Sequence, residues 1–182
     1  MDKISIAEKN RMAALYGLLI GIIYIVITSV VNLKIDDMIM FYVFKTIGYI
    51  IYFIIIGYFA RSIKRANGGF IEFKEIFGAI FIMILIAATI SYVYNYVYMY
   101  YIDPNYMDKI KKASIDFMVK LNAPDDQIDA TAEKFDGQMA EMKKFSLWKN
   151  LLTLSGAYVI DSLFGLIVAV IVRKKKPIVD NF

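Results

Sequence analysis

Residues 76–102 read IFGAIFIMILIAATISYVYNYVYMYYI and form the longest part of the chain without a charged side chain. An α-helix rises about 1.5 Å per residue and a bilayer has a hydrocarbon core of about 30 Å, so about 20 residues cross it. This stretch has 27 residues. We therefore predict one membrane-spanning helix that tilts or extends past the hydrocarbon. A basic loop precedes this helix and a polar segment follows it.

The composition of the chain indicates an integral membrane protein. Apolar residues make up 59% of it, against about 45–50% in soluble domains. Because the sequence contains no cysteine and no histidine, it has no thiol nucleophile and lacks the commonest general base and metal ligand. We therefore expect no catalytic residues, no metal site, no cofactor and no enzymatic activity. Asp161 could act as an acid or base in the membrane, but no second carboxylate lies within the spans to assist it.

Three further apolar runs complete a set of four predicted transmembrane helices. The first run has 22 residues, which is longer than the 7 to 15 residues of a signal-peptide core, so we expect it to remain in the protein. No low-complexity linker divides the chain, and we predict one membrane domain over residues 1–182. The four predicted spans are residues 12–33, 38–60, 76–102 and 151–172.

Residues 103–149 form the polar segment between the third and fourth spans, and their pattern predicts a helical hairpin. Asp103-Pro104 suits a helix start and Asn122-Ala123-Pro124 suits a break. Each half carries one apolar stripe. These stripes could pack on each other, lie on the membrane surface or receive a partner. The stripes are Met107, Ile110, Ser114, Phe117 and Leu121 in the first half, and Ile128, Ala132, Phe135, Met139 and Met142 in the second.

Tyrosines alternate at the end of the third span, a pattern that taken alone would suit a β-strand. An unpaired strand would leave its backbone polar groups unsatisfied at the membrane surface, so we predict a helix. Its two opposite sides would then carry different tyrosines. We expect these tyrosines to form an aromatic belt at the membrane interface. The alternative is a stacking site for a ligand. One side holds Tyr92, Tyr96 and Tyr100, and the other holds Tyr94, Tyr98 and Tyr101.

Polar residues inside the predicted spans are candidates for function. Lys45 must reach the interface or find a partner, because a charge at a helix centre costs about 2.5–3.5 kcal/mol on insertion scales. Asp161 lies near mid-membrane on a stripe of small residues, where another helix can approach. We predict that Lys45 and Asp161 form a buried pair between the second and fourth spans. Ser91 and Asn95 are candidates for a polar lining.

Small residues recur at four-residue spacing on two of the spans, which marks surfaces for close helix packing. The neighbour is either another helix of the same chain or a second copy of the protein. The stripes comprise Ala13, Gly17 and Gly21 in the first span, and Ala157, Gly165 and Ala169 beside Asp161 in the fourth.

The distribution of charge predicts the orientation in the membrane. If both termini are cytoplasmic, the segments on that side hold eleven lysines and arginines against five acidic residues. The opposite segments hold nine basic and eleven acidic residues. Positive charge beside span ends favours the cytoplasmic side. We therefore expect both termini inside, the hairpin outside and the lipid bilayer rather than nucleic acid as the partner of the basic residues.

The chain resembles an uncharacterised bacterial membrane family, domain of unknown function 4199, found mainly in Bacteroidota. The likeness covers nearly the whole chain. It rests on the order of the four spans, on ANGGFIEFKEIFGAIF at residues 66–81, on YIDPNYMDK at residues 101–109 and on the Met- and Lys-rich segment before the fourth span. The resemblance implies a protein of the inner membrane of a Gram-negative cell, hence a periplasmic hairpin. It carries over no activity.

Two functions are compatible with these features. The first is a non-enzymatic partner-binding or accessory protein, whose hairpin and small-residue faces bind another membrane or periplasmic protein or a second copy. The alternative is a small oligomeric transporter or channel subunit that uses Lys45 and Asp161. Short glycine-interrupted half-helices and inverted repeats, which mark many transporters, are absent from the sequence.

Overall fold

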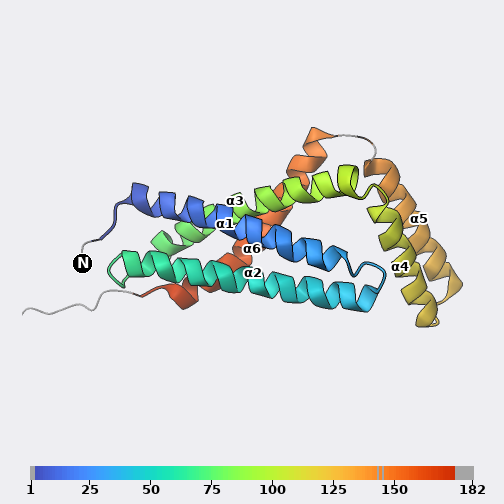
Figure 1. The fold of residues 1–182 in the computed structure, drawn as a ribbon, viewed down its shortest axis with the longest axis horizontal. Helices are drawn as coiled ribbons and strands as arrows, with labels where there is room; N and C mark the ends of the chain where they lie inside the picture. The colour runs from blue at the N-terminus through green and yellow to red at the C-terminus, as the bar shows by residue number, and fades with distance from the viewer. Residues whose placement is uncertain (1–2, 143, 145, 175–182) are drawn as a thin grey trace, which may run out of the picture.

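The computed structural model describes residues 3–142, 144 and 146–174, and this part of the chain is helical without a β-strand (Figure 1). Four helices are long and apolar enough to cross a membrane, and α3 continues into the π-helical turn η1 (Tyr98–Ile102). The prediction of an all-α membrane protein with four spans is thereby confirmed. The four helices are α1 (Ile6–Asn32), α2 (Met38–Ala66), α3 (Phe73–Val97) and α6 (Leu147–Val172).

The helices run beyond the apolar stretches because polar residues cap their ends. Ser5 accepts a hydrogen bond from the Glu8 backbone N–H at 3.1 Å, and Asp37 accepts one from the Met40 N–H at 3.1 Å. Such side chains satisfy the free N–H groups of a first helical turn. After α2, Gly68 and Gly69 have φ angles of 77° and 84°, which glycine adopts without strain. Helix α2 therefore ends at this pair of glycines, before the third span begins.

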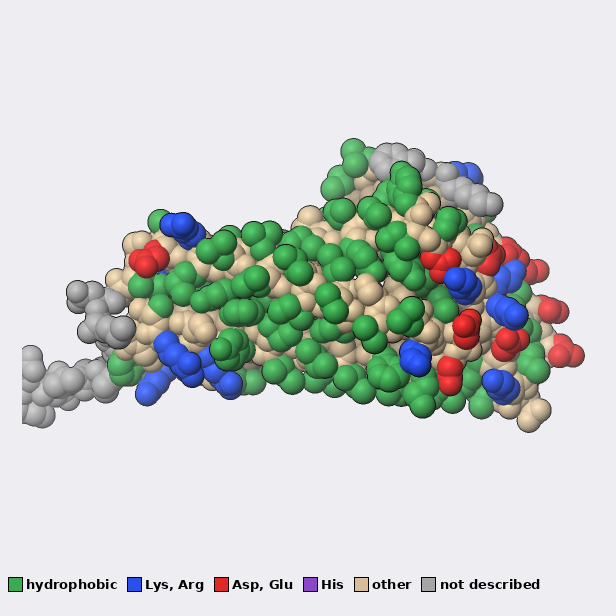
Figure 2. Space-filling view, viewed as in Figure 1, with side chains coloured by type: hydrophobic (Ala, Val, Ile, Leu, Met, Phe, Trp, Pro, Cys, Tyr) green, Lys and Arg blue, Asp and Glu red, His purple; other side chains and the backbone are tan. Residues whose placement is uncertain are grey.

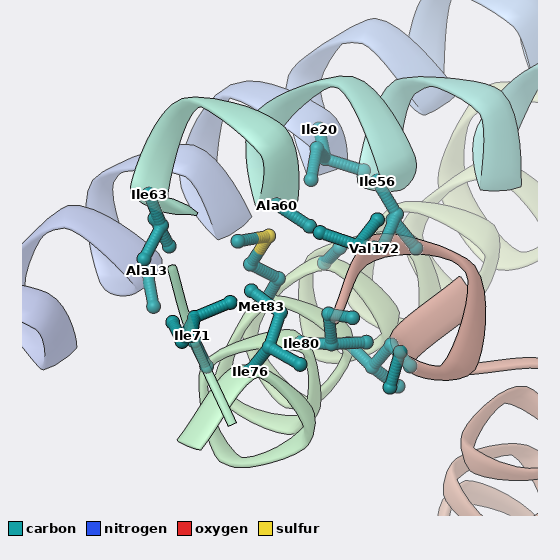
Figure 3. Close-up of a cluster of buried hydrophobic side chains, with 14 of the residues drawn as sticks. Ala13, Ile20, Ile56, Ala60, Ile63, Ile71, Ile76, Ile80, Met83 and Val172 are labelled. Carbon is teal, nitrogen blue, oxygen red and sulfur yellow. The ribbon is translucent and has the colours of Figure 1, made fainter. Parts of the chain in front are cut away.

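Helix α3 is the most buried of the four spans and lies at the centre of the bundle. A cluster of apolar side chains from all four spans surrounds it (Figure 3). The largest fully buried members include Ile20 on α1, Ile56 on α2, Ile80 and Met83 on α3, and Val172 on α6. The core therefore joins every span to α3 in the half of the bundle that contains the start of α1 and the end of α6.

The small-residue stripes are used within the chain. A Cβ atom added at Gly17 would lie 3.0 Å from the Met83 carbonyl oxygen, and one added at Gly21 would lie 2.9 Å from the Ile90 side chain, so α1 sits closely against α3. At Gly165 of α6 the same atom would lie 2.8 Å from Ile84 of α3. These glycines therefore pack against a neighbouring helix of the same chain. Ala13 and Ala169 are also buried, whereas Ala157 is only partly buried.

The two ends of the bundle differ in charge. Lysines and arginines gather where α1 begins, α2 meets α3 and α6 ends, while both signs mix at the other end (Figure 2). Glu75 ties α1 to α3 by ion pairs with Lys3 at 2.8 Å and Lys9 at 3.2 Å. The α2–α3 loop joins the end of α6 through two backbone hydrogen bonds between Ile71 and Lys174. The charge count that predicts the orientation includes four lysines next to α6 in the sequence. They are Lys143, Lys144, Lys175 and Lys176. All but Lys144 lie outside the described residues, as does Phe145.

The predicted hairpin consists of α4 (Tyr106–Lys120) and α5 (Asp125–Met142), which pack against each other across the end of the bundle (Figure 1). Asn122 closes α4 in the left-handed region, with φ of 53°. Ala113 of α4 is buried in a second apolar cluster with residues of α1, α2 and their connecting turn, whereas α5 has no buried residue. The hairpin is thus attached through α4. The other buried members of this cluster are Val31, Ile35, Met38 and Phe41.

We expect Gly17→Leu to lower the melting temperature of the detergent-solubilised protein, because the new side chain would meet the α3 backbone. Overpacking of this kind costs about 1–3 kcal/mol. Gly78→Leu is the matched control, since a Cβ atom there meets nothing within 4 Å. Equal melting temperatures for the two variants would show that α1 does not depend on this close approach.

Candidate functional site

A buried carboxyl group lies inside the bundle at Asp161 of α6, which is 9% exposed. The Tyr49 hydroxyl of α2 donates a hydrogen bond to its Oδ1 atom. The ring of Tyr52 lies 6.1 Å from that of Tyr49 and 5.0 Å from that of Tyr24 on α1. The buried Tyr52 hydroxyl has no hydrogen-bond partner among the described residues. Asp161 therefore faces protein, in a cluster of tyrosines contributed by two other helices.

The structure does not bring Lys45 and Asp161 together, so the predicted ion pair is wrong. Neither residue takes part in an ion pair within the described chain. The Lys45 ammonium lies 5.7 Å from the ring centre of Phe41, one helical turn nearer the hairpin. Tyr49 follows Lys45 by one turn, and one turn is about 5.4 Å of depth. Tyr49 is thus at the level of the carboxyl group, and Lys45 is too far toward the end of the helix.

A cavity of about 260 Å³ with both polar and apolar walls lies between α1, α2 and α3 at the hairpin end. It is lined by Lys45 and Asn95, two of the predicted polar residues, together with Tyr24, Thr28 and Asn32 of α1. Ser91 does not line it, because its hydroxyl donates to the Ala87 carbonyl of its own helix at 2.8 Å. Asn95 donates its amide to the Ser91 carbonyl at 2.9 Å. The predicted polar lining is thus present at Asn95 and absent at Ser91.

The hairpin forms one wall of this cavity through Tyr106 of α4. Its hydroxyl donates to the Asn32 Oδ1 atom at 3.2 Å, and burial raises the pKa of Tyr106 to about 12. The Asn32 Nδ2 atom is buried and has no partner among the described residues. A buried amide donor without a partner is costly. The cavity therefore offers a lysine and several hydroxyl groups to a small polar guest.

The polar lining occupies one half of the bundle. On the other side of Asp161, Gly165 packs on Ile80 and Ile84 of α3, and the apolar cluster fills the space between the spans. A groove of about 400 Å³ between α2 and α6 runs along this half and is lined mainly by apolar side chains such as Phe53 and Phe164. Apolar side chains thus predominate on the side of Asp161 away from the hairpin.

Sequence reasoning missed most of this cluster. Tyr24, Thr28 and Asn32 repeat at four-residue spacing and continue the small-residue face of α1 toward the hairpin. This polar continuation of a helix-packing face was the sequence signal that could have predicted the cavity. Tyr49 and Tyr52 gave a weaker one, since tyrosines are frequent throughout these spans and membrane-interface tyrosines need no internal partner.

The alternating tyrosines of the third span lie on two sides of a helix, as predicted. On one side the Tyr92 hydroxyl donates to Asn150 of α6 at 2.6 Å. On the other, the hydroxyls of Tyr94 and Ser29 of α1 share a hydrogen bond of 2.6 Å. These tyrosines therefore connect spans as well as occupying the end of the helix. No group of three or more histidine, cysteine, aspartate or glutamate side chains suited to a metal ion occurs in the described part of the chain.

Comparison with known families identifies the family to which the chain belongs. The family model described as protein of unknown function (DUF4199) matches residues 14–174, which is most of the chain, so the protein belongs to this family. No curated protein and no solved structure matches it. The family match begins within α1 and covers the other three spans and the hairpin.

We predict that Tyr49 and Asp161 are energetically coupled and that Lys45 is independent of both. In a double-mutant cycle, Tyr49→Phe and Asp161→Leu should differ from additivity by about 0.6–1.7 kcal/mol, the range of interhelical hydrogen bonds in membranes. Lys45→Met and Asp161→Leu should add to within about 0.3–0.5 kcal/mol. Unfolding in a denaturing detergent measures both cycles. Coupling to Lys45 instead of Tyr49 would contradict the observed geometry.

Proposed function

We propose that this protein is a non-enzymatic accessory protein of the bacterial cytoplasmic membrane that binds a partner protein through its helical hairpin. The observation that carries the proposal is that the hairpin is attached to the bundle mainly through α4. Helix α4 is fixed by Ala113 and by the Tyr106–Asn32 hydrogen bond, while α5 packs on α4 and contributes no buried residue. One helix thus serves as a support and the other has its outer face free.

The chemistry of that face suits a basic partner surface. The first turns of α5 carry four exposed carboxylates, none of which takes part in an ion pair with a described residue. Exposed charges of one sign steer a partner of the opposite sign and select against others. They contribute more to recognition than to the stability of the hairpin, because isolated surface charges are well solvated. The four residues are Asp125, Asp126, Asp129 and Glu133.

The proposal predicts a discrete complex that depends on these carboxylates. The protein extracted from native membranes with a mild detergent should migrate on a native gel as a species larger than the purified monomer in detergent. Replacing Asp125, Asp129 and Glu133 together by lysine should abolish the larger species, since like charges would then face each other. Asp36→Lys, an exposed carboxylate in the α1–α2 turn, is the control and should leave the complex intact. A complex unaffected by the triple substitution would refute the proposed surface.

We further propose that both termini are cytoplasmic and the hairpin is extracytoplasmic. The concentration of lysine and arginine at the end of the bundle opposite the hairpin supports this orientation (Figure 2). Because the chain lacks cysteine, single cysteines introduced at Lys120 and Lys174 can be labelled without background. In intact spheroplasts an impermeant maleimide should label Lys120→Cys and not Lys174→Cys. The reverse pattern would invert the topology.

A small transporter or channel subunit is the second candidate, favoured by the cavity that contains Lys45 and by the buried carboxyl group of Asp161. One chain has an apolar core beyond that residue, so this function would require a path formed between several copies. A proton or cation flux in proteoliposomes would favour the transporter if Asp161→Leu removes it. Lys34→Met in the α1–α2 turn is the control and should leave the flux unchanged. Absence of flux would favour the accessory protein.

A further inference from the structure

A second cavity, of about 790 Å³, lies between the end of α3, the end of α5 and the beginning of α6. Its volume falls in the range of about 300–1,000 Å³ that is typical of ligand sites. One part of its wall is aromatic and apolar, with Tyr92 and Tyr96 of α3 and Met99 of η1. The other part is polar and comes mainly from α5 and the start of α6. The cavity therefore has the two-sided character that an amphipathic ligand requires.

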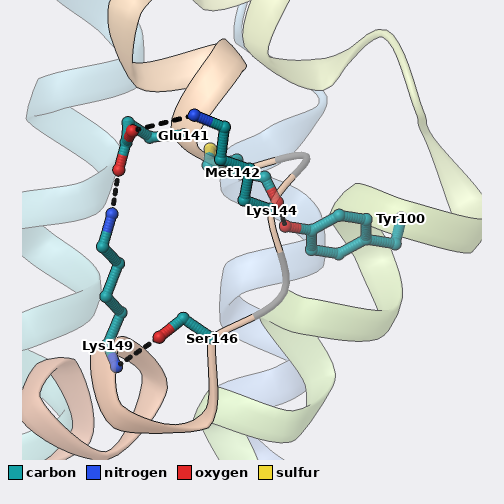
Figure 4. A network of polar contacts seen from close by, with 6 residues as sticks. All are labelled: Tyr100, Glu141, Met142, Lys144, Ser146 and Lys149. Atoms are coloured by element: carbon teal, nitrogen blue, oxygen red, sulfur yellow. Dashed lines mark hydrogen bonds and ion pairs between the residues drawn. The ribbon is translucent and has the colours of Figure 1, made fainter.

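The polar wall is organised around Glu141, as Figure 4 shows. Glu141 forms ion pairs with Lys144 at 3.7 Å and with Lys149 of α6. The Tyr100 hydroxyl donates to the Met142 carbonyl at 2.7 Å. These contacts connect the hairpin to both spans and frame the cavity without filling it.

The lining carries a net positive charge. It contains Lys134, Lys144 and Lys149 against Glu141 alone, which gives three positive charges, one negative charge and a net charge of +2. Lys134 has no ion-pair partner among the described residues. The cavity thus presents an available ammonium group beside an aromatic surface.

The position of the cavity relative to the membrane favours a lipid over a soluble ligand. Helix α6 begins at this cavity with Trp148, which is 74% exposed, and Leu152, which is 63% exposed. Exposed tryptophan marks the headgroup level of a bilayer, and large exposed apolar side chains beyond it face the acyl chains. On the facing wall, Tyr92 to Tyr100 spans about 12 Å of helix at about 1.5 Å per residue. The cavity thus extends from the headgroup level into the apolar part of one leaflet.

We propose that this cavity binds one phospholipid with an anionic headgroup. The headgroup lies near Lys134 on α5, and an acyl chain lies along Tyr92, Tyr96 and Met99. Lysines beside a membrane attract anionic lipid headgroups, and the aromatic and thioether side chains provide an adaptable apolar surface. This site is separate from the acidic outer face of α5, so it neither requires nor excludes the proposed partner.

Gly137 allows a sharp test, because it lines the cavity and a Cβ atom there would meet nothing within 4 Å. Gly137→Phe should fill the cavity without disturbing α5, in which glycine is the least favourable residue apart from proline. Gly78→Phe introduces the same side chain at an open position in the other end of the bundle and is the control. A second pair of variants tests the role of charge. Lys134→Gln removes a lysine that lines the cavity, and Lys120→Gln, the control, removes an exposed hairpin lysine that does not line it.

Delipidated protein would be incubated with dioleoylphosphatidylglycerol or dioleoylphosphatidylcholine and analysed by native mass spectrometry. We expect one retained phosphatidylglycerol per chain, lost in Gly137→Phe and kept in Gly78→Phe. Lys134→Gln should reduce the preference for phosphatidylglycerol about fivefold, the effect of one lysine near an anionic lipid, and Lys120→Gln should not.

Four results would overturn the proposal. The first is equal retention of the two lipids by the unmodified protein, and the second is unchanged retention in Gly137→Phe. The third is displacement of phosphatidylglycerol by excess inorganic phosphate, which would assign the cavity to a free anion. A protein dimer that Gly137→Phe dissociates would likewise place a second copy in the cavity instead of lipid.

Discussion

The close approach of α1 and α6 to α3 is the constraint on which the structure depends. Lipid chains are as apolar as leucine, so spans do not associate by excluding water, and contact between well-fitting surfaces must hold them together. Gly17, Gly21 and Gly165 permit that contact because no side chain separates the helices. α3 is consequently enclosed on two sides, which is why it is more buried than the other spans.

This packing divides the bundle into two halves with different kinds of cohesion. The half with the chain ends is held by apolar contact, as the cluster around Ile56, Ile80 and Met83 shows (Figure 3). The half near the hairpin is connected by hydrogen bonds between spans, including Ser29 with Tyr94, Tyr92 with Asn150 and Thr89 with Tyr158, each at 2.6 Å. Both cavities with polar groups in their walls occur in this half.

The order of the helices could be predicted from the sequence because bilayer thickness and helical rise fix the length of a span, and glycine and proline mark its ends. The small-residue faces and the burial of Asp161 could be predicted for the same local reason. The partner of Asp161 could not, because choosing between Lys45 and Tyr49 requires the relative depth of α2 and α6 to within one turn. That depth is set by helix crossing at Gly165 and by contacts of α3, which no local pattern records.

The two cavities are mechanically related through the wall that they share. Asn95 of α3 and Met99 of η1 line both, so one turn of helix separates the space below α5 from the space near Lys45. The shared wall thus crosses from α3 into the π-helical segment, a type of turn that is frequent at functional sites. Tyr106 of α4 closes the smaller cavity from the hairpin side. The hairpin therefore supplies a wall to each cavity, through α4 at the smaller one and α5 at the larger one.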